Sequence, residues 1–379
     1  MCLQRNQESR KEDSHEGLGM DSANKEGISR ISDGIIEEEP RNITIHDSPT
    51  KSQEEAVDAQ LNKSNNEIRS ANNTQNFIRC QSYTSNEWGM VIGASLRGKS
   101  HIESAVGCQD FHLYEDLGEG WHLLIVSDGA GSAKYADRGS RGNCNVASKL
   151  LKEMLAANGW INNAVFPSEL EWYIECRSIF EKMKLIYRSK AKEQNEDTEE
   201  TDFNATIILC LITPIGILVT HIGDGRMGYL SKSDEWKSLM TPHKGEEANQ
   251  TLFLQNLWTI PHVPAFRVSG VLVPEVRIIR EVPKAVVLIS DGCERAAWEC
   301  SIYNDLTGRF EDVNLPHPAF LNPLLDSIIS EKEDKLQLLI DIMDRGTKAC
   351  EQERDDKTML IAILNNSNEL SDIQTRQTD

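Results

Sequence analysis

Two apolar runs in this sequence stop at the same three residues, Ser-Asp-Gly. They are "LLIVSDGAG" (123–131) and "VVLISDGCE" (286–294). An Asp-Gly pair is a favoured hairpin turn, and a hairpin needs a second strand directly after it. After Asp128 and Asp291 the chain shows no such alternation. A third run ends at Asp224, where "GRMGYLS" resumes the alternation, so we interpret Asp224 as a turn residue.

Two further aspartates stand where apolar runs begin. Asp110 opens a run in "CQDFHLY", and Asp355 precedes another in "RDDKTMLIAIL". Carboxylates brought together at strand ends repel one another unless a cation lies between them. Mg²⁺ and Mn²⁺ prefer oxygen ligands of this kind, and no His-x-x-His or cysteine cluster suggests zinc instead. From residue type alone, a cation site and ordinary solvated strand ends both stay open.

The pattern of elements shows what would position these carboxylates. Strands come in runs and helices in pairs, without the strict strand–helix alternation of a parallel α/β fold. This order favours antiparallel sheets with helices on their faces, an α+β fold. One helix is expected to begin with the capping box Ser168-x-x-Glu171 and to turn Leu170, Ile174, Phe180 and Met183 inward. We expect strands at 90–98, 111–116, 121–129, 205–213, 216–224, 225–231, 275–282, 285–292 and 359–364, and helices at 140–159, from 168, and around 323–345.

Composition sets the limits of the folded region and of its partners. Residues 1–85 are polar, with few aromatic side chains, and are expected to be disordered; 86–366 would form one domain, and 367–379 a polar tail. The net charge of -20 argues against binding a nucleic-acid backbone. The nine cysteines are scattered, with no Cys-x-x-Cys pair, so Cys108 and Cys293 are expected to be buried thiols. With no apolar run of about 18 residues and no secretion signal, we expect a cytoplasmic protein.

Six motifs in order carry a resemblance to a known family. "CQDFH", "IVSDGAGSAKYADRGS", "FNATIILCLI", "THIGDGRMGYL", "LISDGCE" and "DDKTMLIAI" resemble the metal-dependent protein phosphatases, the PPM or type 2C serine/threonine phosphatases. The likeness is to the bacterial-type branch and covers about residues 88–365. It implies a four-layer α-β-β-α sandwich of two antiparallel sheets flanked by helices. It also implies two Mn²⁺ or Mg²⁺ ions, which make bound water acidic enough to attack a phosphate ester.

The resemblance also implies roles for single residues. Asp128 would bridge the two metals and Gly129 would offer its carbonyl; Asp110, Asp291 and Asp355 would complete the shells, and Asp202 would be a ligand for a third metal. Asp128, Asp291 and His101 are the residues that we expect to act in catalysis. The substrate would be phosphoserine or phosphothreonine in a protein, and the enzyme would oppose a serine/threonine kinase.

The sequence departs from the family pattern at two places. Ala130 replaces the histidine that many members use near the leaving group, and "SAVGCQ" before Asp110 lacks the usual arginine. Arg97, Lys99 and His101 lie upstream, and we expect His101 to contact the substrate phosphate.

Other features are given structural or access roles. His112, His122 and His221 alternate within strands and are expected to be structural. Residues 240–256 are expected to form a flap beside the cleft or an ordinary surface loop. Two other functions stay open: a catalytically silent binding or regulatory module of the same fold, and a hydrolase of small phosphoesters.

Overall fold

The computed structural model describes residues 77–163, 165–243, 251–255, 266–268, 271–300 and 302–365. The expected polar tail over 367–379 lies outside the described residues, as do most of the expected N-terminal disordered region and residues 244–250 and 256 of the expected flap. Among the described helices, none is long and apolar enough to cross a membrane.

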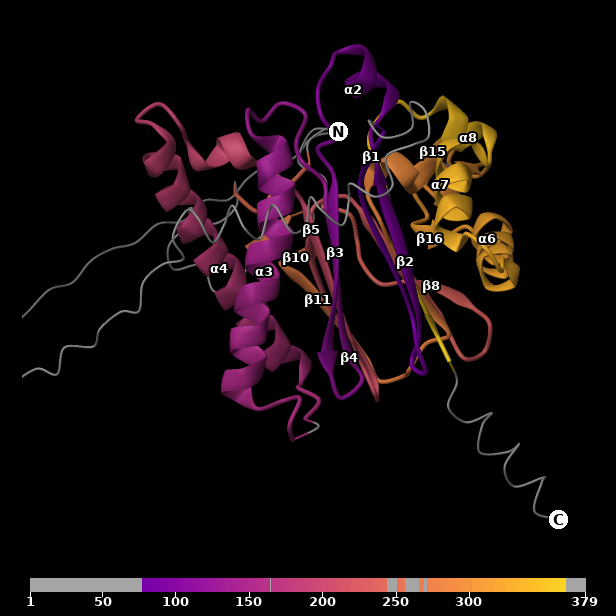
Figure 1. The fold of residues 1–379 in the computed structure, drawn as a ribbon, viewed down its shortest axis with the longest axis horizontal. Coiled ribbons are helices and arrows are strands. Elements are labelled where there is room, and N and C mark those ends of the chain that lie inside the picture. Colours follow the sequence, from indigo (N-terminus) through magenta and orange to yellow (C-terminus); the bar gives the residue numbers. More distant parts are fainter. Residues whose placement is uncertain are drawn as a thin grey trace, which may run out of the picture. The chain divides into compact units, whose positions relative to one another are not determined.

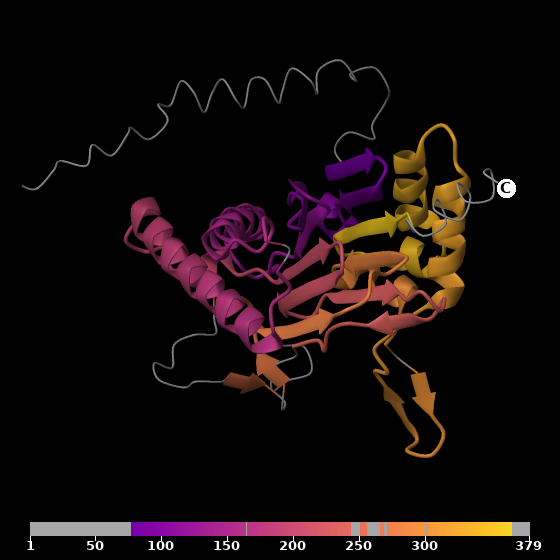
Figure 2. The same cartoon turned by 90° about the horizontal axis from the view of Figure 1, so that it is seen from below.

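Two large antiparallel sheets organise the described part of the chain (Figures 1 and 2). The first has six strands in the order β1-β2-β17-β12-β7-β8. Their bounds are Ile78–Ser85, Gly89–Leu96, Lys357–Leu364, Ala285–Ile289, Arg226–Leu230 and Trp236–Ser238. The second has five, β11-β6-β5-β4-β3, with bounds Glu275–Ile279, Gly216–Ile222, Ile207–Thr213, Trp121–Ser127 and Phe111–Gly118.

Helices cover the outer face of each sheet (Figures 1 and 2). α3 (Ala136–Asn158) and α4 (Glu169–Gln194) pack on the second sheet; α6 (Pro318–Ser330) and α7 (Lys335–Arg345) pack on the first. The shorter elements are α2 (Lys99–Glu103), η1 (Glu200–Phe203), β9 (Phe266–Val268), β10 (Val271–Val273), η2 (Asp291–Cys293), α5 (Glu294–Ala297), β13 (Trp298–Glu299), β14 (Ile302–Asn304), β15 (Arg309–Glu311), β16 (Leu315–Pro316) and α8 (Lys348–Gln352).

Three apolar cores separate four layers. One core lies between α3/α4 and the second sheet, one between the two sheets, and one between the first sheet and α6/α7. β12 shows why its sequence is continuously apolar: Val286 and Leu288 enter the core between the sheets, whereas Val287 and Ile289 enter the core under α6/α7. β4 divides in the same way between the other two cores. The predicted sandwich of two antiparallel sheets flanked by helices is therefore confirmed.

Two local predictions were wrong. β1 lies in the region 1–85 that we expected to be disordered; its polar sequence is tolerated because β1 is an edge strand that pairs with β2 on one side and is partly exposed. In α4 the predicted capping box at Ser168 and Glu171 is present, and Phe180 and Met183 are buried as predicted, but Leu170 and Ile174 are exposed. The buried face runs through Trp172 instead, and because Trp172 lies about 200° around the helix from Leu170, both faces cannot be buried.

Candidate active site

The ends of β4 and β12 bring the two Ser-Asp-Gly aspartates together. β4 belongs to the second sheet and β12 to the first, and the two strands face each other across the core between the sheets. Asp128 follows β4 directly and Asp291 begins η2 after β12. Their carboxyl groups lie close enough that each affects the pKa of the other. Two segments far apart in the sequence thus deliver adjacent acidic groups.

The loop after β4 is fixed through its backbone. The Asp128 N–H donates to Thr206 Oγ1 (3.0 Å), and the Thr206 N–H donates to the Asp128 carbonyl (2.8 Å). Gly129 forms an isolated antiparallel bridge with Ala205. A Cβ on Gly129 would stand 2.5 Å from the Ala136 carbonyl oxygen, so this position requires glycine.

Asp110 is held at the start of β3 by a neighbour from the other sheet. It is only 1% exposed, and Ser290 Oγ donates to its Oδ2 at 2.7 Å. The same Ser290 hydroxyl accepts the Thr358 N–H of β17 at 2.9 Å. Asp110 is therefore tied to the segment that carries Asp291.

The paired aspartates before β17 have different surroundings. Asp356 is 3% exposed and accepts the N–H groups of Gly98 (2.6 Å) and Gln109 (2.5 Å). Asp355 lies at the surface, and its Oδ1 accepts the Asp356 N–H at 2.8 Å. His101 Nδ1 lies 2.9 Å from Asp356 Oδ1, off the direction of a hydrogen bond. One ligand atom from each of His101, Asp355 and Asp356 falls within 4.8 Å of the others.

The carboxyl groups of the aspartate cluster raise one another's pKa. Burial, and then the charge of Asp110, holds the pKa of Asp128 well above its ordinary value. Burial, and then the charge of Asp356, does the same for the pKa of Asp110. Burial and the charge of Asp224 raise the pKa of Asp291 to about 7. Among the described residues, Asp291 Oδ1 is buried without a hydrogen-bond partner. Repelling acidic groups with an unsatisfied oxygen suit a divalent cation.

Asp224 corrects the hairpin interpretation. β6 before it and β7 after it belong to different sheets, so the chain crosses between the sheets at this point instead of turning back. The charge of Asp224 raises the pKa of both Asp128 and Asp291, and Thr251 Oγ1 donates to Asp224 Oδ2. Sequence reasoning missed Asp224, although its apolar run ends on Asp-Gly as the other two do. It also missed Asp356, which the doubled aspartate of "RDDK" could have suggested.

Other candidate residues have different contacts. The Asp202 carboxylate accepts the Glu199 N–H (3.1 Å), and its carbonyl accepts the Tyr135 N–H (2.7 Å). Arg97 donates to the His101 carbonyl at 2.8 Å, and Lys99 donates to the Glu351 carbonyl.

The two thiols near the aspartates are inert. Cys108 and Cys293 are buried and not in a disulfide, and burial raises the pKa of each thiol, which makes both poor nucleophiles.

Known proteins share this sequence pattern. The family profile described as Protein phosphatase 2C matches residues 97–339. Serine/threonine-protein phosphatase 3 of Escherichia coli (strain K12) is 25% identical over 283 residues, which cover 73% of this chain and 98% of that protein. Among solved structures, serine/threonine phosphatase Stp1 from Staphylococcus aureus has a TM-score of 0.45 at 13% identity, covering 75% of this chain and 99% of its own. RsbX in complex with magnesium has a TM-score of 0.43 at 12% identity, covering 76% and 100%.

Proposed function

Because the chain belongs to the protein phosphatase 2C family, we propose that it is a metal-dependent serine/threonine protein phosphatase with its active site at the aspartate cluster. One observation carries the proposal: Asp128 and Asp291 follow strands of different sheets, and their carboxyl groups lie close enough to affect each other's pKa. Buried acidic groups that repel one another destabilise the fold by themselves, and binding a cation gives them a function.

We propose that the chain holds two Mn²⁺ or Mg²⁺ ions. The ligands would be the carboxylates of Asp110, Asp128, Asp291 and Asp355 together with the carbonyl of Gly129. Such ions supply acidic water for attack on phosphorus and neutralise phosphoryl oxygens. Asp202 stays outside the proposed set, because its carboxylate already caps the 3-10 turn at Glu199.

The chain's own residues orient these ligands. Ser290 fixes Asp110 through its hydroxyl, and Thr206 fixes the backbone of Asp128. The Asp356 carboxylate accepts the N–H groups of Gly98, which directly precedes α2, and of Gln109, and these bonds hold α2 beside the site. His101 Nδ1 faces Asp356, which leaves Nε2 as the nitrogen to meet a substrate phosphate. We therefore keep His101 as the proposed phosphate contact.

We propose phosphoserine or phosphothreonine in a protein as the substrate, in opposition to a serine/threonine kinase, within the cytoplasm. We extend the N-terminal boundary of the phosphatase domain from residue 86 to Ile78, because β1 completes the edge of the first sheet. The polar segment before it and the tail 367–379 are proposed to lie outside the catalytic domain.

The test is phosphate release by the full chain from a phosphothreonine peptide in the presence of Mn²⁺. Asp128→Asn is expected to lower turnover by about 100-fold or more, because it removes the central carboxylate. Asp305→Asn changes an exposed aspartate in the turn between β14 and β15 and should retain full turnover. Turnover that survives both a chelator and Asp128→Asn would refute the proposed site.

Two further outcomes identify the other functions. Binding of the phosphopeptide without turnover, at any Mn²⁺ concentration, would indicate a silent binding module. Faster turnover of a small aryl phosphate than of the peptide would indicate a hydrolase of small phosphoesters.

A further inference from the structure

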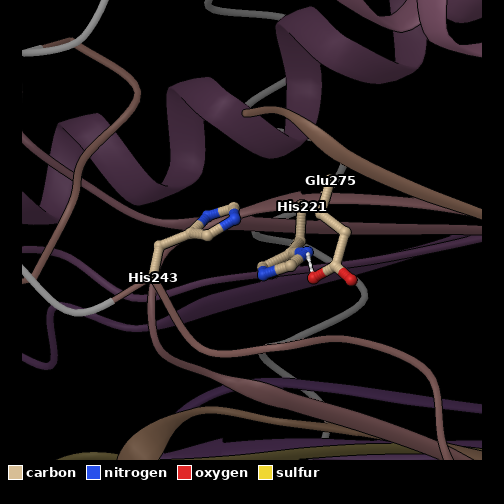
Figure 3. A group of neighbouring side chains, drawn as sticks. All are labelled: His221, His243 and Glu275. Atoms are coloured by element: carbon tan, nitrogen blue, oxygen red, sulfur yellow. Dashed lines mark ion pairs between the residues drawn. The ribbon is translucent and has the colours of Figure 1, made fainter. Parts of the chain in front are cut away.

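A second cluster of side chains of the types that bind metals lies beside the second sheet. His221 is near the end of β6, and Glu275 begins β11 directly opposite it in the strand pairing. His243 follows the loop after β8. His221, His243 and Glu275 are 1%, 1% and 4% exposed, and one ligand atom of each lies within 4.8 Å of the others (Figure 3). None of the three belongs to the proposed phosphatase site.

Two acceptor atoms face each other in this cluster. His221 Nε2 lies 2.9 Å from the Thr241 carbonyl, which can only accept, so Nε2 carries the ring proton. The lone pair of His221 Nδ1 therefore points to Glu275, whose Oε2 is 3.8 Å away (Figure 3). That gap is too long for a hydrogen bond. A cation between them would satisfy both.

His243 supplies a second nitrogen, which is the third candidate ligand. Its ring stacks on His221 with centroids 4.2 Å apart and an interplanar angle of 8°. Within the described part of the chain, His243 Nε2 and His221 Nδ1 are both buried without a hydrogen-bond partner. Burial lowers the pKa of His243 to about 4 and the pKa of His221 well below its ordinary value, so both rings are neutral and each has a lone pair.

We propose that His221, His243 and Glu275 form a binding site for a divalent transition metal, with Zn²⁺ as the expected ion. Two histidines and one glutamate with an open position form a recurrent zinc ligand set. Two ligands on a tetrahedral zinc stand about 3.4 Å apart, so the 3.8 Å gap between His221 and Glu275 needs only a small closure. The His243 ring would tilt out of the stack and release its long, 3.4 Å contact with the Gly223 N–H.

The surroundings already orient the proposed ligands. The Thr241 carbonyl fixes the His221 ring, as outer partners of metal-bound histidines do. The Glu275 carboxylate accepts the Thr241 N–H at 2.6 Å and Arg277 Nη2 at 2.7 Å. Each carboxylate oxygen retains a second lone pair, so these bonds leave Glu275 able to bind an ion.

The experiment is a calorimetric titration of the full chain, freed of metals by a chelator that is then removed. Zn²⁺ is the titrant, and the buffer contains excess Mg²⁺ to occupy the aspartate cluster. We expect one equivalent of Zn²⁺ that His243→Asn abolishes. His122→Asn changes another buried histidine, on β4, and should leave that equivalent intact. Equal Zn²⁺ stoichiometry in the parent and His243→Asn, or no Zn²⁺ bound by the parent, would overturn the proposal and leave a water molecule between the acceptors.

A second variant keeps the test decisive if His243→Asn fails to fold. Glu275→Gln keeps the size of the side chain, and its amide oxygen can still accept the Thr241 N–H, so the fold should persist, which circular dichroism checks. Because a neutral amide is a poorer zinc ligand than a carboxylate, Zn²⁺ binding is expected to weaken by at least about 10-fold. Unchanged Zn²⁺ affinity in Glu275→Gln would remove Glu275 from the ligand set and refute the site.

Discussion

Asp291 makes the stability of the metal-free protein depend on pH in an unusual direction. Its pKa is about 7 in the folded chain against 3.8 ordinarily, because it is buried beside Asp224. The folded state therefore binds a proton more tightly than the unfolded state does. Between these two values, stability falls as the pH rises, and above about pH 7 the full penalty applies.

The size of the effect follows from the shift. A difference of roughly three pKa units corresponds to about 4 kcal/mol of unfolding free energy, which is an upper limit for a half-buried group. Asp291→Asn removes this contribution, because an amide does not titrate in the range. The slope of stability against pH should become shallower by up to about 1.4 kcal/mol per pH unit. In the variant the pKa values of Asp110 and Asp128 lose the contribution of the Asp291 charge but stay raised by burial, so part of the slope remains.

The assay is urea unfolding in a chelator from about pH 5 to about pH 8. At the upper end Asp291→Asn should be more stable than the parent; with excess Mg²⁺ the order should reverse, because the parent alone keeps its full ligand set. Asp305→Asn serves as the exposed control and should follow the parent. A parent whose stability is flat or rises over this range in chelator would refute the reasoning.

Three further substitutions test the positioning of the site and the packing behind it. Ser290→Ala removes the hydroxyl that joins Asp110 to the Thr358 N–H and should lower the unfolding free energy by about 1–3 kcal/mol in urea; no loss would mean that water replaces it. Gly129→Ala places a Cβ against the Ala136 carbonyl and should lower phosphopeptide turnover by about 100-fold, whereas Gly107→Ala, whose Cβ meets nothing within 4 Å, should not; equal rates would contradict this. Trp172→Ala empties a fully buried position and removes the hydrogen bond from Nε1 to the Val219 carbonyl (2.9 Å), so the free energy of unfolding should fall by about 3–5 kcal/mol. A fall of less than about 1 kcal/mol would show that the core collapses into the cavity.

The sandwich was predictable because its central strands are buried on both faces. β5 and β12 read as unbroken apolar runs for this reason, and the runs stop where the chain leaves the core. The stopping residues Asp128 and Asp291 were predictable for the same reason. The sequence of one strand does not show which sheet the next strand joins. Asp224 was misinterpreted for this reason, because β6 and β7 belong to different sheets.

Other features depend on contacts between distant segments. Asp356 is distinguished from Asp355 by the N–H groups of Gly98 and Gln109, which only the folded chain brings near. The cluster around Glu275 has no motif, because its three ligands come from separate elements. The inward face of α4 was predicted correctly at Phe180 and Met183 but not in the first turns of the helix, where Trp172 and not Leu170 fills the core.

The interleaved side chains between the sheets also determine the geometry of the acidic centre. Asp128 and Asp291 follow strands of opposite sheets, and Val126 and Leu288 lie in the core between those sheets. The separation of the two carboxyl groups therefore depends on the volume of side chains that are buried away from solvent. Enlarging or trimming these core side chains would change the ion radius that the proposed metal site accepts, without altering any proposed ligand.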